Sequence, residues 1–269
     1  MITTCRNRWP FNRLAGRGAW TAAAVLAIVS LVFGCGMSQV KKDQADRHVN
    51  IALAYLQSSQ HNSALKELLD AEKLVPEDSR IHYLLGIAYH GKGLREQAMG
   101  EFRKATALKP DYSEAHNYLG MVYFEQGQFE KAIASFREAL SNVVYDTPSV
   151  ALYNMGRAYQ KTGNTEMALS KYAEAVMRDP GSSLIPLIEK DTAVILYDRG
   201  DYERAIRHLR RAVDRVPTFV EAFYWLGESY LKVHDQAKAA EAFRTVVGLG
   251  PDSDFGAKAK KRLETLKGR

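Results

Sequence analysis

One pattern of about 34 residues recurs along this chain from residue 45 onward, and such an internal period strongly limits the possible folds. Five prolines mark the ends of successive copies, at intervals of 34, 70, 37 and 34 residues: Pro76, Pro110, Pro180, Pro217 and Pro251. The interval of 70 contains two copies, so the chain carries six. Units of this length cannot bury their apolar faces alone and must stack. The period therefore predicts a solenoid, and a protein-binding scaffold rather than an enzyme.

Small residues recur at fixed places in the copies, which indicates two closely packed helices per copy. In the third copy, apolar residues at helical spacing lie on both sides of a break at Gly127. The first small position holds Ala52, Gly86, Gly120, Gly156, Ala193 and Gly227, and the second holds Ala64, Ala98, Ala132, Ala168, Ala205 and Ala239. The turns between the two helices hold Ser59, Gly93, Gly127, Gly163, Gly200 and His234. We expect left-handed backbone there.

These residues resemble the signature of the tetratricopeptide repeat (TPR) family. In the third copy the matching residues are His116, Leu119, Gly120, Tyr123, Ala132, Phe136 and Ala139. The resemblance implies an all-α solenoid of six helix-turn-helix repeats. The expected repeats are 45–78, 79–112, 113–148, 149–185, 186–219 and 220–253. Residues 254–269 have an apolar stripe and basic side chains, which predicts a capping helix; a basic helix facing a membrane is the alternative.

Two joints between repeats are longer than the period requires. Two residues are added within 143–149, and three are added around 181–185. A small change of twist at each joint is one interpretation, and a bend or partner contact at the longer loop is the other.

The first 34 residues have the features of a secretory signal. Arginines precede an apolar run from Ala19 to Phe33, which is short for a membrane span. The run leads into Leu31-Val-Phe-Gly-Cys35, which resembles a bacterial lipobox. This resemblance implies cleavage after residue 34, acylation of Cys35, a tether over 35–44 and, from Gly36, an outer-membrane location. An ordinary helix cysteine and an uncleaved signal anchor remain as alternatives.

Net charge and chemistry argue against several function classes. The formal charge of +6 includes four signal arginines, which leaves 6 − 4 = +2, so we expect no nucleic-acid partner. His48, His82 and His116 occupy equivalent places in three repeats, too far apart to share a metal, and packing explains them better. We find no phosphate loop and no convergent catalytic group, and expect no catalytic residue, cofactor, metal or small-molecule substrate.

In TPR proteins the first helices of the pairs line a groove, and this resemblance implies a protein-binding surface here. Its residues would be Val49, Leu53, Leu56, Tyr83, Ile87, Asn117, Met121, Phe124, Tyr153, Arg157, Lys190, Val194, Tyr197, Tyr224 and Leu231. The surface suits an amphipathic or apolar segment of a partner. Two alternatives stay open: the tyrosines are the usual residues of the repeat, or the junction at 143–149 is the main site.

The signal, the tether and six repeats together are similar to the TPR lipoproteins of type IV pilus biogenesis. The longer junction Leu140-Ser-Asn-Val-Val-Tyr-Asp-Thr-Pro148 is the most distinctive local element. The resemblance implies a lipid-anchored pilotin on the periplasmic face of the outer membrane that assists secretin localisation and assembly. The alternative is a general envelope adaptor for a peptidoglycan enzyme, a protease or another assembly machine.

Overall fold

A computed structural model describes residues 38–267 of the chain. The predicted signal segment 1–34 and the predicted acylation site Cys35 lie outside the described residues. Among the described residues, no helix combines the length and the apolar character needed to cross a bilayer.

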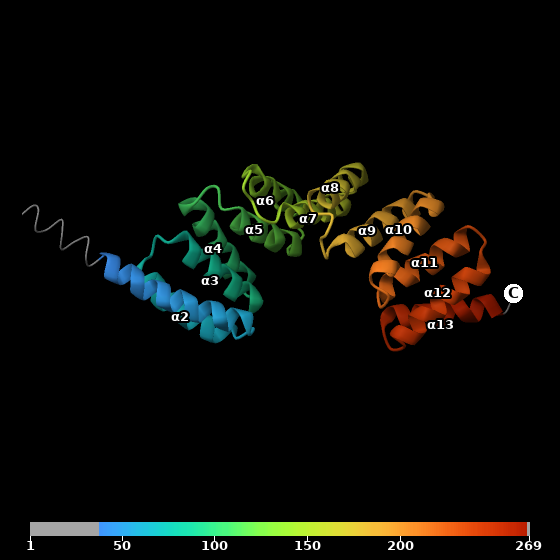
Figure 1. Ribbon diagram of the computed structural model, residues 1–269, viewed down its shortest axis with the longest axis horizontal. Helices are drawn as coiled ribbons and strands as arrows, with labels where there is room; N and C mark the ends of the chain where they lie inside the picture. Colours follow the sequence, from blue (N-terminus) through green and yellow to red (C-terminus); the bar gives the residue numbers. More distant parts are fainter. Residues whose placement is uncertain (1–37, 268–269) are drawn as a thin grey trace, which may run out of the picture. The chain divides into compact units, whose positions relative to one another are not determined.

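The described residues are helices joined by short loops, with no strand among them, which confirms the predicted all-α class (Figure 1). Residues 38–57 form the first helix. The others are α2 (His61–Leu74), α3 (Ser79–Gly91), α4 (Arg95–Leu108), α5 (Ser113–Glu125), α6 (Phe129–Ser141), α7 (Pro148–Lys161), α8 (Thr165–Arg178), α9 (Ile185–Asp198), α10 (Tyr202–Arg215), α11 (Val220–Lys232), α12 (Gln236–Leu249) and α13 (Asp254–Lys267).

The chain divides into two compact units, residues 1–97 and 98–269. In the described part of the first unit, a core forms between the helix over 38–57, α2 and α3, around Val49, Leu68 and Leu85. In the second unit, α5 packs on α6, α7 on α8, α9 on α10 and α11 on α12. Each of these pairs buries its alanine positions completely.

The turns within the pairs have the left-handed backbone that their sequence predicts. Gly93, Gly127, Gly163 and Gly200 all have positive φ, and nothing fills the space beside them. The two turns without glycine adopt the same conformation, with φ of 56° at Ser59 and 63° at His234. Side chains are strained in this region, so the pairing of the helices enforces the turn even without glycine.

The helix α13 covers the end of the second unit, as a capping helix does. Ala259 is fully buried, and Leu263 and Leu266 pack on the core between α11 and α12. Arg262 donates two hydrogen bonds to the buried carboxylate of Glu228 in α11, at 2.6 and 2.8 Å. Gly256 lies so close to the Gly250 carbonyl that an added Cβ would stand 2.0 Å from its oxygen. These contacts fix α13 on the last pair.

Candidate functional site

A large cavity of the second unit lies at the joint between the fourth and fifth repeats, where extra residues around 181–185 break the period. There α8 and α9 meet over a shorter stretch than the helices at the neighbouring joints. The space between the repeats becomes a cavity of ≈ 780 Å³. Its walls come from α7, α9 and α11, the first helices of three successive pairs, with further residues near the ends of α7 to α9. The lining consists of Tyr153, Arg157, Gln160, Lys161, Thr165, Leu187, Lys190, Asp191, Val194, Ile195, Asp198, Arg199, Glu221 and Trp225. We call it the α7–α9–α11 pocket.

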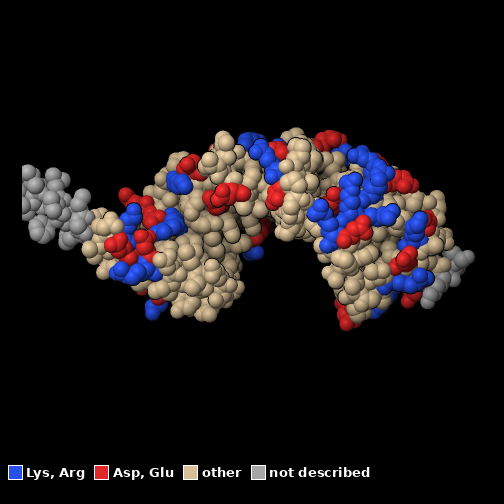
Figure 2. All heavy atoms as spheres, viewed as in Figure 1, with Lys and Arg blue, Asp and Glu red and all other residues tan. Residues whose placement is uncertain are grey.

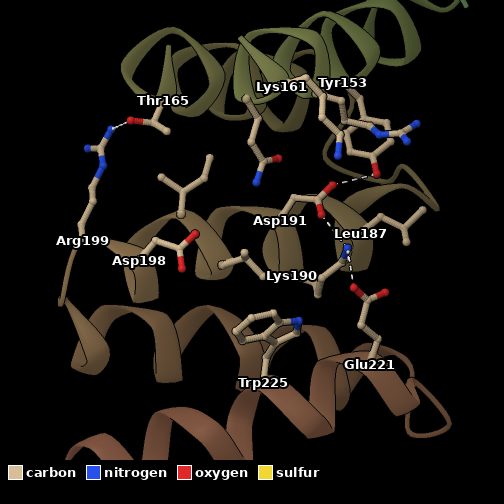
Figure 3. A pocket seen from close by; sticks show the side chains of 14 residues that line it. Tyr153, Lys161, Thr165, Leu187, Lys190, Asp191, Asp198, Arg199, Glu221 and Trp225 are labelled. Atoms are coloured by element: carbon tan, nitrogen blue, oxygen red, sulfur yellow. Dashed lines mark hydrogen bonds and ion pairs between the residues drawn. The ribbon is translucent and has the colours of Figure 1, made fainter. Parts of the chain in front are cut away.

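A chain of polar contacts joins the three helices across this pocket (Figure 3). The Lys190 ammonium on α9 lies 2.6 Å from the Asp191 carboxylate and 3.2 Å from Glu221 on α11. On the other side, the Tyr153 hydroxyl on α7 donates a hydrogen bond of 2.9 Å to Asp191. The side chains of Lys190 and Asp191 are only 13% and 11% exposed. Since truncating one member would leave a buried charge without its partner, the network holds α7, α9 and α11 in register.

The surroundings of Lys190 and Tyr153 keep these two side chains in fixed protonation states. Burial lowers the pKa of Lys190, but the carboxylates of Asp191 and Glu221 outweigh that effect and raise the pKa above its ordinary value. Burial, together with the Asp191 charge, raises the pKa of Tyr153 well above that of a free phenol. Near neutral pH the lysine is therefore charged and the tyrosine is a permanent donor. The network is preorganised, so a ligand does not have to order it.

Apolar and cationic side chains surround this polar network. Trp225 and Leu187 line the pocket beside Lys190, and Leu187 is 36% exposed. The guanidinium of Arg157 lies 4.8 Å from the centroid of the Phe124 ring and 5.7 Å from that of Tyr153. Contacts of this kind hold an arginine in place while its outer edge stays available for an anion. Figure 3 shows Asp198 and Arg199 at the opposite end of the pocket.

A smaller apolar niche lies next to this pocket, and Arg157 contributes to both. Between α5 and α7, the niche has a volume of ≈ 140 Å³ and is lined by Met121, Phe124, Glu125, Phe136, Asn154 and Arg157. It has room for one apolar side chain of a partner. The amide of Asn154 donates a weak hydrogen bond of 3.4 Å to Asn117.

The structure brings several of the predicted groove residues of the second unit together. Tyr153, Arg157, Lys190 and Val194 line the α7–α9–α11 pocket. Met121 and Phe124 line the niche, and Asn117 is buried and accepts the hydrogen bond from Asn154. The Tyr197 ring packs edge-on against Trp225, whereas Tyr224 and Leu231 pack against the capping helix α13.

In the first unit one predicted groove residue is misplaced. Val49 is fully buried in the core, so its interpretation as a surface residue is wrong. The helical period places it on the face that packs against α2 and α3. Leu53 is 38% exposed, and Leu56, Tyr83 and Ile87 are half-buried against the same core. These four residues leave apolar surface in the first unit.

Asp191, Glu221 and Trp225 are among the pocket residues that sequence reasoning missed. A signal was present, because Glu189, Lys190 and Asp191 place three consecutive charges within the largely apolar sequence of α9. Adjacent charges on a helix that must pack on both sides need partners. The sequence does not show that Glu221 and Tyr153, on two other helices, supply them.

The three equivalent histidines have hydrogen-bonding roles. His82 and His116 each contact, through Nε2, the carbonyl of the proline six residues earlier, Pro76 at 2.8 Å and Pro110 at 2.9 Å. His48 instead contacts Glu67 at 2.7 Å through Nδ1.

The junction at 143–149 combines one buried side chain with two exposed apolar side chains. Tyr145 is buried against Ala139 and Ala151, which raises the pKa of its hydroxyl through burial. Val143 and Val144 are 98% and 80% exposed. The junction therefore presents two exposed apolar side chains.

Comparison with known proteins agrees with this architecture. Family models described as tetratricopeptide repeat match residues 79–112, 111–178 and 191–254, and one described as TPR repeat matches residues 52–93. The chain belongs to the tetratricopeptide repeat family. No curated protein sequence matches it.

Three solved structures share the fold at low sequence identity. PilF of Pseudomonas aeruginosa is 19% identical, with a TM-score of 0.73 over 82% of this chain and 99% of PilF. PilW, described as a widely conserved type IV pilus biogenesis factor, is 20% identical, with a TM-score of 0.72 over 80% of this chain and 97% of PilW. YrrB, described as a TPR protein with an unusual peptide-binding site, is 21% identical, with a TM-score of 0.57 over 72% of this chain and 97% of YrrB.

Proposed function

We propose that this protein is a non-catalytic scaffold that holds a segment of an envelope partner protein in the α7–α9–α11 pocket. The observation that carries the proposal is the pocket itself, which opens at an interruption of the repeat and has a rigid, charge-paired network across it. Its lining is mixed, with Leu187 and Trp225 for apolar side chains and Arg157 for an acidic group. Such a lining suits a peptide segment better than a small apolar molecule.

The partner we propose is the secretin of a type IV pilus, whose localisation and assembly at the outer membrane the protein would assist. The lipobox at Cys35 and the fold shared with PilF and PilW support this choice. An acylated Cys35 would tie the chain to the periplasmic face of the outer membrane. Residues 38–44 of the predicted tether belong to the first helix, so only Gly36 and Met37 stand between Cys35 and that helix, which keeps the first repeat close to the lipid. Holding a secretin segment there raises its effective concentration at the membrane.

The test uses the full chain in its host, with secretin multimers on gels and co-purified partner as readouts. Deleting the gene should abolish outer-membrane secretin multimers, and Cys35→Ser should mislocalise both proteins. Leu187→Glu and Arg157→Glu should each reduce the co-purified partner at least tenfold, because they place a negative charge on the pocket wall. Intact multimers in the deletion strain would overturn the secretin assignment.

Matched controls separate loss of the pocket from loss of the fold. Met177→Glu changes a residue of α8 that is 74% exposed and does not line the pocket, so it should leave partner binding unchanged. All variants must keep the helix content of the wild type by circular dichroism. If Leu53→Asp in the first unit abolishes binding while Leu187→Glu does not, the site lies on the apolar surface of the first unit. Capture of a peptidoglycan hydrolase or protease without secretin would favour the adaptor function.

A further inference from the structure

The outward face of α10 carries a concentration of arginines that the repeat does not require. Within its 14 residues α10 has five arginines and two acids. All five arginines are exposed: Arg204, Arg207, Arg210, Arg211 and Arg215. Spacings of three and four residues place Arg204, Arg207, Arg211 and Arg215 in one stripe along the helix. The opposite face is buried in the core of this pair through Ile206 and Leu209.

The equivalent second helices of the other pairs provide an internal comparison. Counting Lys and Arg against Asp and Glu, α10 has a net charge of +3 (five against two). The same count gives −1 for α2 (two against three), 0 for α6 and for α8 (two against two in each), and +1 for α4 (three against two) and for α12 (two against one). All six helices pack through alanines and one to three larger apolar side chains. Packing therefore does not explain the arginines of α10.

Neighbouring acids compensate this charge only in part. Arg204 pairs with Asp201 at 3.3 Å, and Arg211 lies 3.7 Å from Glu189. Within residues 38–267, Arg207, Arg210 and Arg215 have no ion pair. Like charges three and four residues apart on a helix repel each other and destabilise it. Figure 2 shows Lys and Arg side chains gathered over this part of the second unit.

The arginine stripe lacks the apolar centre of a protein interface. None of the large exposed apolar side chains lies on α10. Stable protein–protein interfaces have an apolar, well-packed core, whereas binding to an anionic bilayer needs only basic groups near the headgroups. A guanidinium also presents paired donors that match the oxygens of a phosphate. The exposed side chains of α10 thus match phosphate-bearing lipid headgroups better than an acidic protein.

We propose that the arginine stripe of α10 is a contact surface for anionic phospholipid headgroups. It is separate from the α7–α9–α11 pocket, because no arginine of α10 lines that pocket. It is also independent of Cys35, so it would act as a second membrane signal beside any lipid anchor. Two weak signals together hold a protein on a membrane far more firmly than one. Since α10 packs on α9, contact through the stripe would hold the pocket wall near the bilayer.

The test measures the melting temperature of the full chain in vesicles by circular dichroism. Vesicles of phosphatidylcholine alone are compared with vesicles that contain about a third phosphatidylglycerol. A surface bound only in the folded state raises the midpoint, and we expect a rise of about 2–4 °C in the anionic vesicles. High salt should remove the rise, because the contact is electrostatic.

Variants assign the effect to α10. Arg207→Gln, Arg211→Gln and Arg215→Gln combined should abolish the rise while leaving the midpoint in neutral vesicles close to that of the wild type. The control combines Lys66→Gln, Lys73→Gln and Lys131→Gln, which removes three exposed charges from α2 and α6 and should keep the rise. Equal midpoints in the two kinds of vesicle, or an unchanged rise in the arginine variant, would overturn the proposal. A rise with added polyglutamate but not with anionic vesicles would also overturn it, in favour of an acidic protein.

Discussion

The two helices of a repeat pack against each other in one of two ways. Repeats three, four and six use one arrangement, and repeats one and five use the other. In the first group a glycine faces an aromatic ring sixteen residues later: Gly120 faces Phe136, Gly156 faces Tyr172 and Gly227 faces Phe243. An added Cβ would meet the ring at 2.6, 2.5 and 2.7 Å. At the same spacing, the second group has Ala52 with Leu68 and Ala193 with Leu209, all fully buried.

This difference shows that the repeat conserves the filled volume rather than particular residues. A methyl group added on the first helix accompanies a smaller side chain on the second, so that the space between the backbones remains filled. Interiors are packed as densely as organic crystals, and either change alone would overfill or empty the site. The irregularity of repeat five at Thr192-Ala193 is therefore a compensated substitution.

Repeats one and five also share a histidine–glutamate contact between their two helices, with the two residues exchanged. In repeat one His48 on the first helix contacts Glu67 on the second. In repeat five, the glutamate is on the first helix and the histidine on the second, as Glu189 and His208, with the same separation of nineteen residues. The contact therefore requires one histidine and one glutamate that face each other, and either helix can supply either residue.

We expect the largest change in stability when alanine replaces the glycine that faces an aromatic ring, as in repeat three. Gly120→Ala places a methyl group against the fully buried Phe136 ring and should cost about 1–3 kcal/mol of stability. Adding Phe136→Leu creates the alanine–leucine arrangement and should recover part of the loss. Urea unfolding followed by circular dichroism measures both. The control Gly248→Ala, which has open space beside its Cβ position, should not destabilise. If the Gly120→Ala variant had the same urea midpoint as the wild type, the conclusion that each helix pair keeps its filled volume constant would be wrong.

A smaller effect should follow from relieving the strained turn of repeat one. Ser59→Gly removes a side chain from left-handed backbone and should stabilise the protein by about 0.5–1 kcal/mol after the extra freedom of glycine in the unfolded chain is subtracted. The reverse change Gly127→Ser in repeat three should destabilise by a similar amount. Thermal melting of the two variants measures both signs. Two shifts in the same direction would contradict the prediction.

The smallest effect concerns the exchanged ion pairs. The double change Glu189→His with His208→Glu gives repeat five the order found in repeat one, and the stability should stay close to that of the wild type. Either single change should cost about 0.2–1 kcal/mol, as expected for pairs at the edge of the solvent. A double-mutant cycle in urea measures the coupling between the two sites. Purely additive losses would mean that the contact contributes nothing.

Local signals made much of the fold predictable. The positive φ at Gly127 and its equivalents follows from glycine at a break in the apolar period, and Ser59 and His234 were identified by register alone. The buried alanines and the capping helix follow from periodicity. The family geometry puts the position of Val49 near the groove, whereas in this first helix its side chain turns into the core.

The candidate site was less predictable because its contacts join helices that are distant in the sequence. The repeat register predicts four of the pocket residues: Tyr153, Arg157, Lys190 and Val194. Their convergence on one pocket with Glu221 and Trp225 depends on how the repeats stack at the joint around 181–185. Glu221 lies 31 positions after Lys190, and nothing in the spacing marks them as partners.

The sequence by itself determined the repeat, its turns and its small-residue positions, because each depends on backbone conformation or on the period of a single helix. Only the tertiary structure decided which substitutions compensate each other and where a pocket opens. It alone placed Lys190 between the carboxylates of Asp191 and Glu221 and joined Arg262 to Glu228. Charges inside a packed array are stable only beside partners, and the stacking of helices chooses those partners.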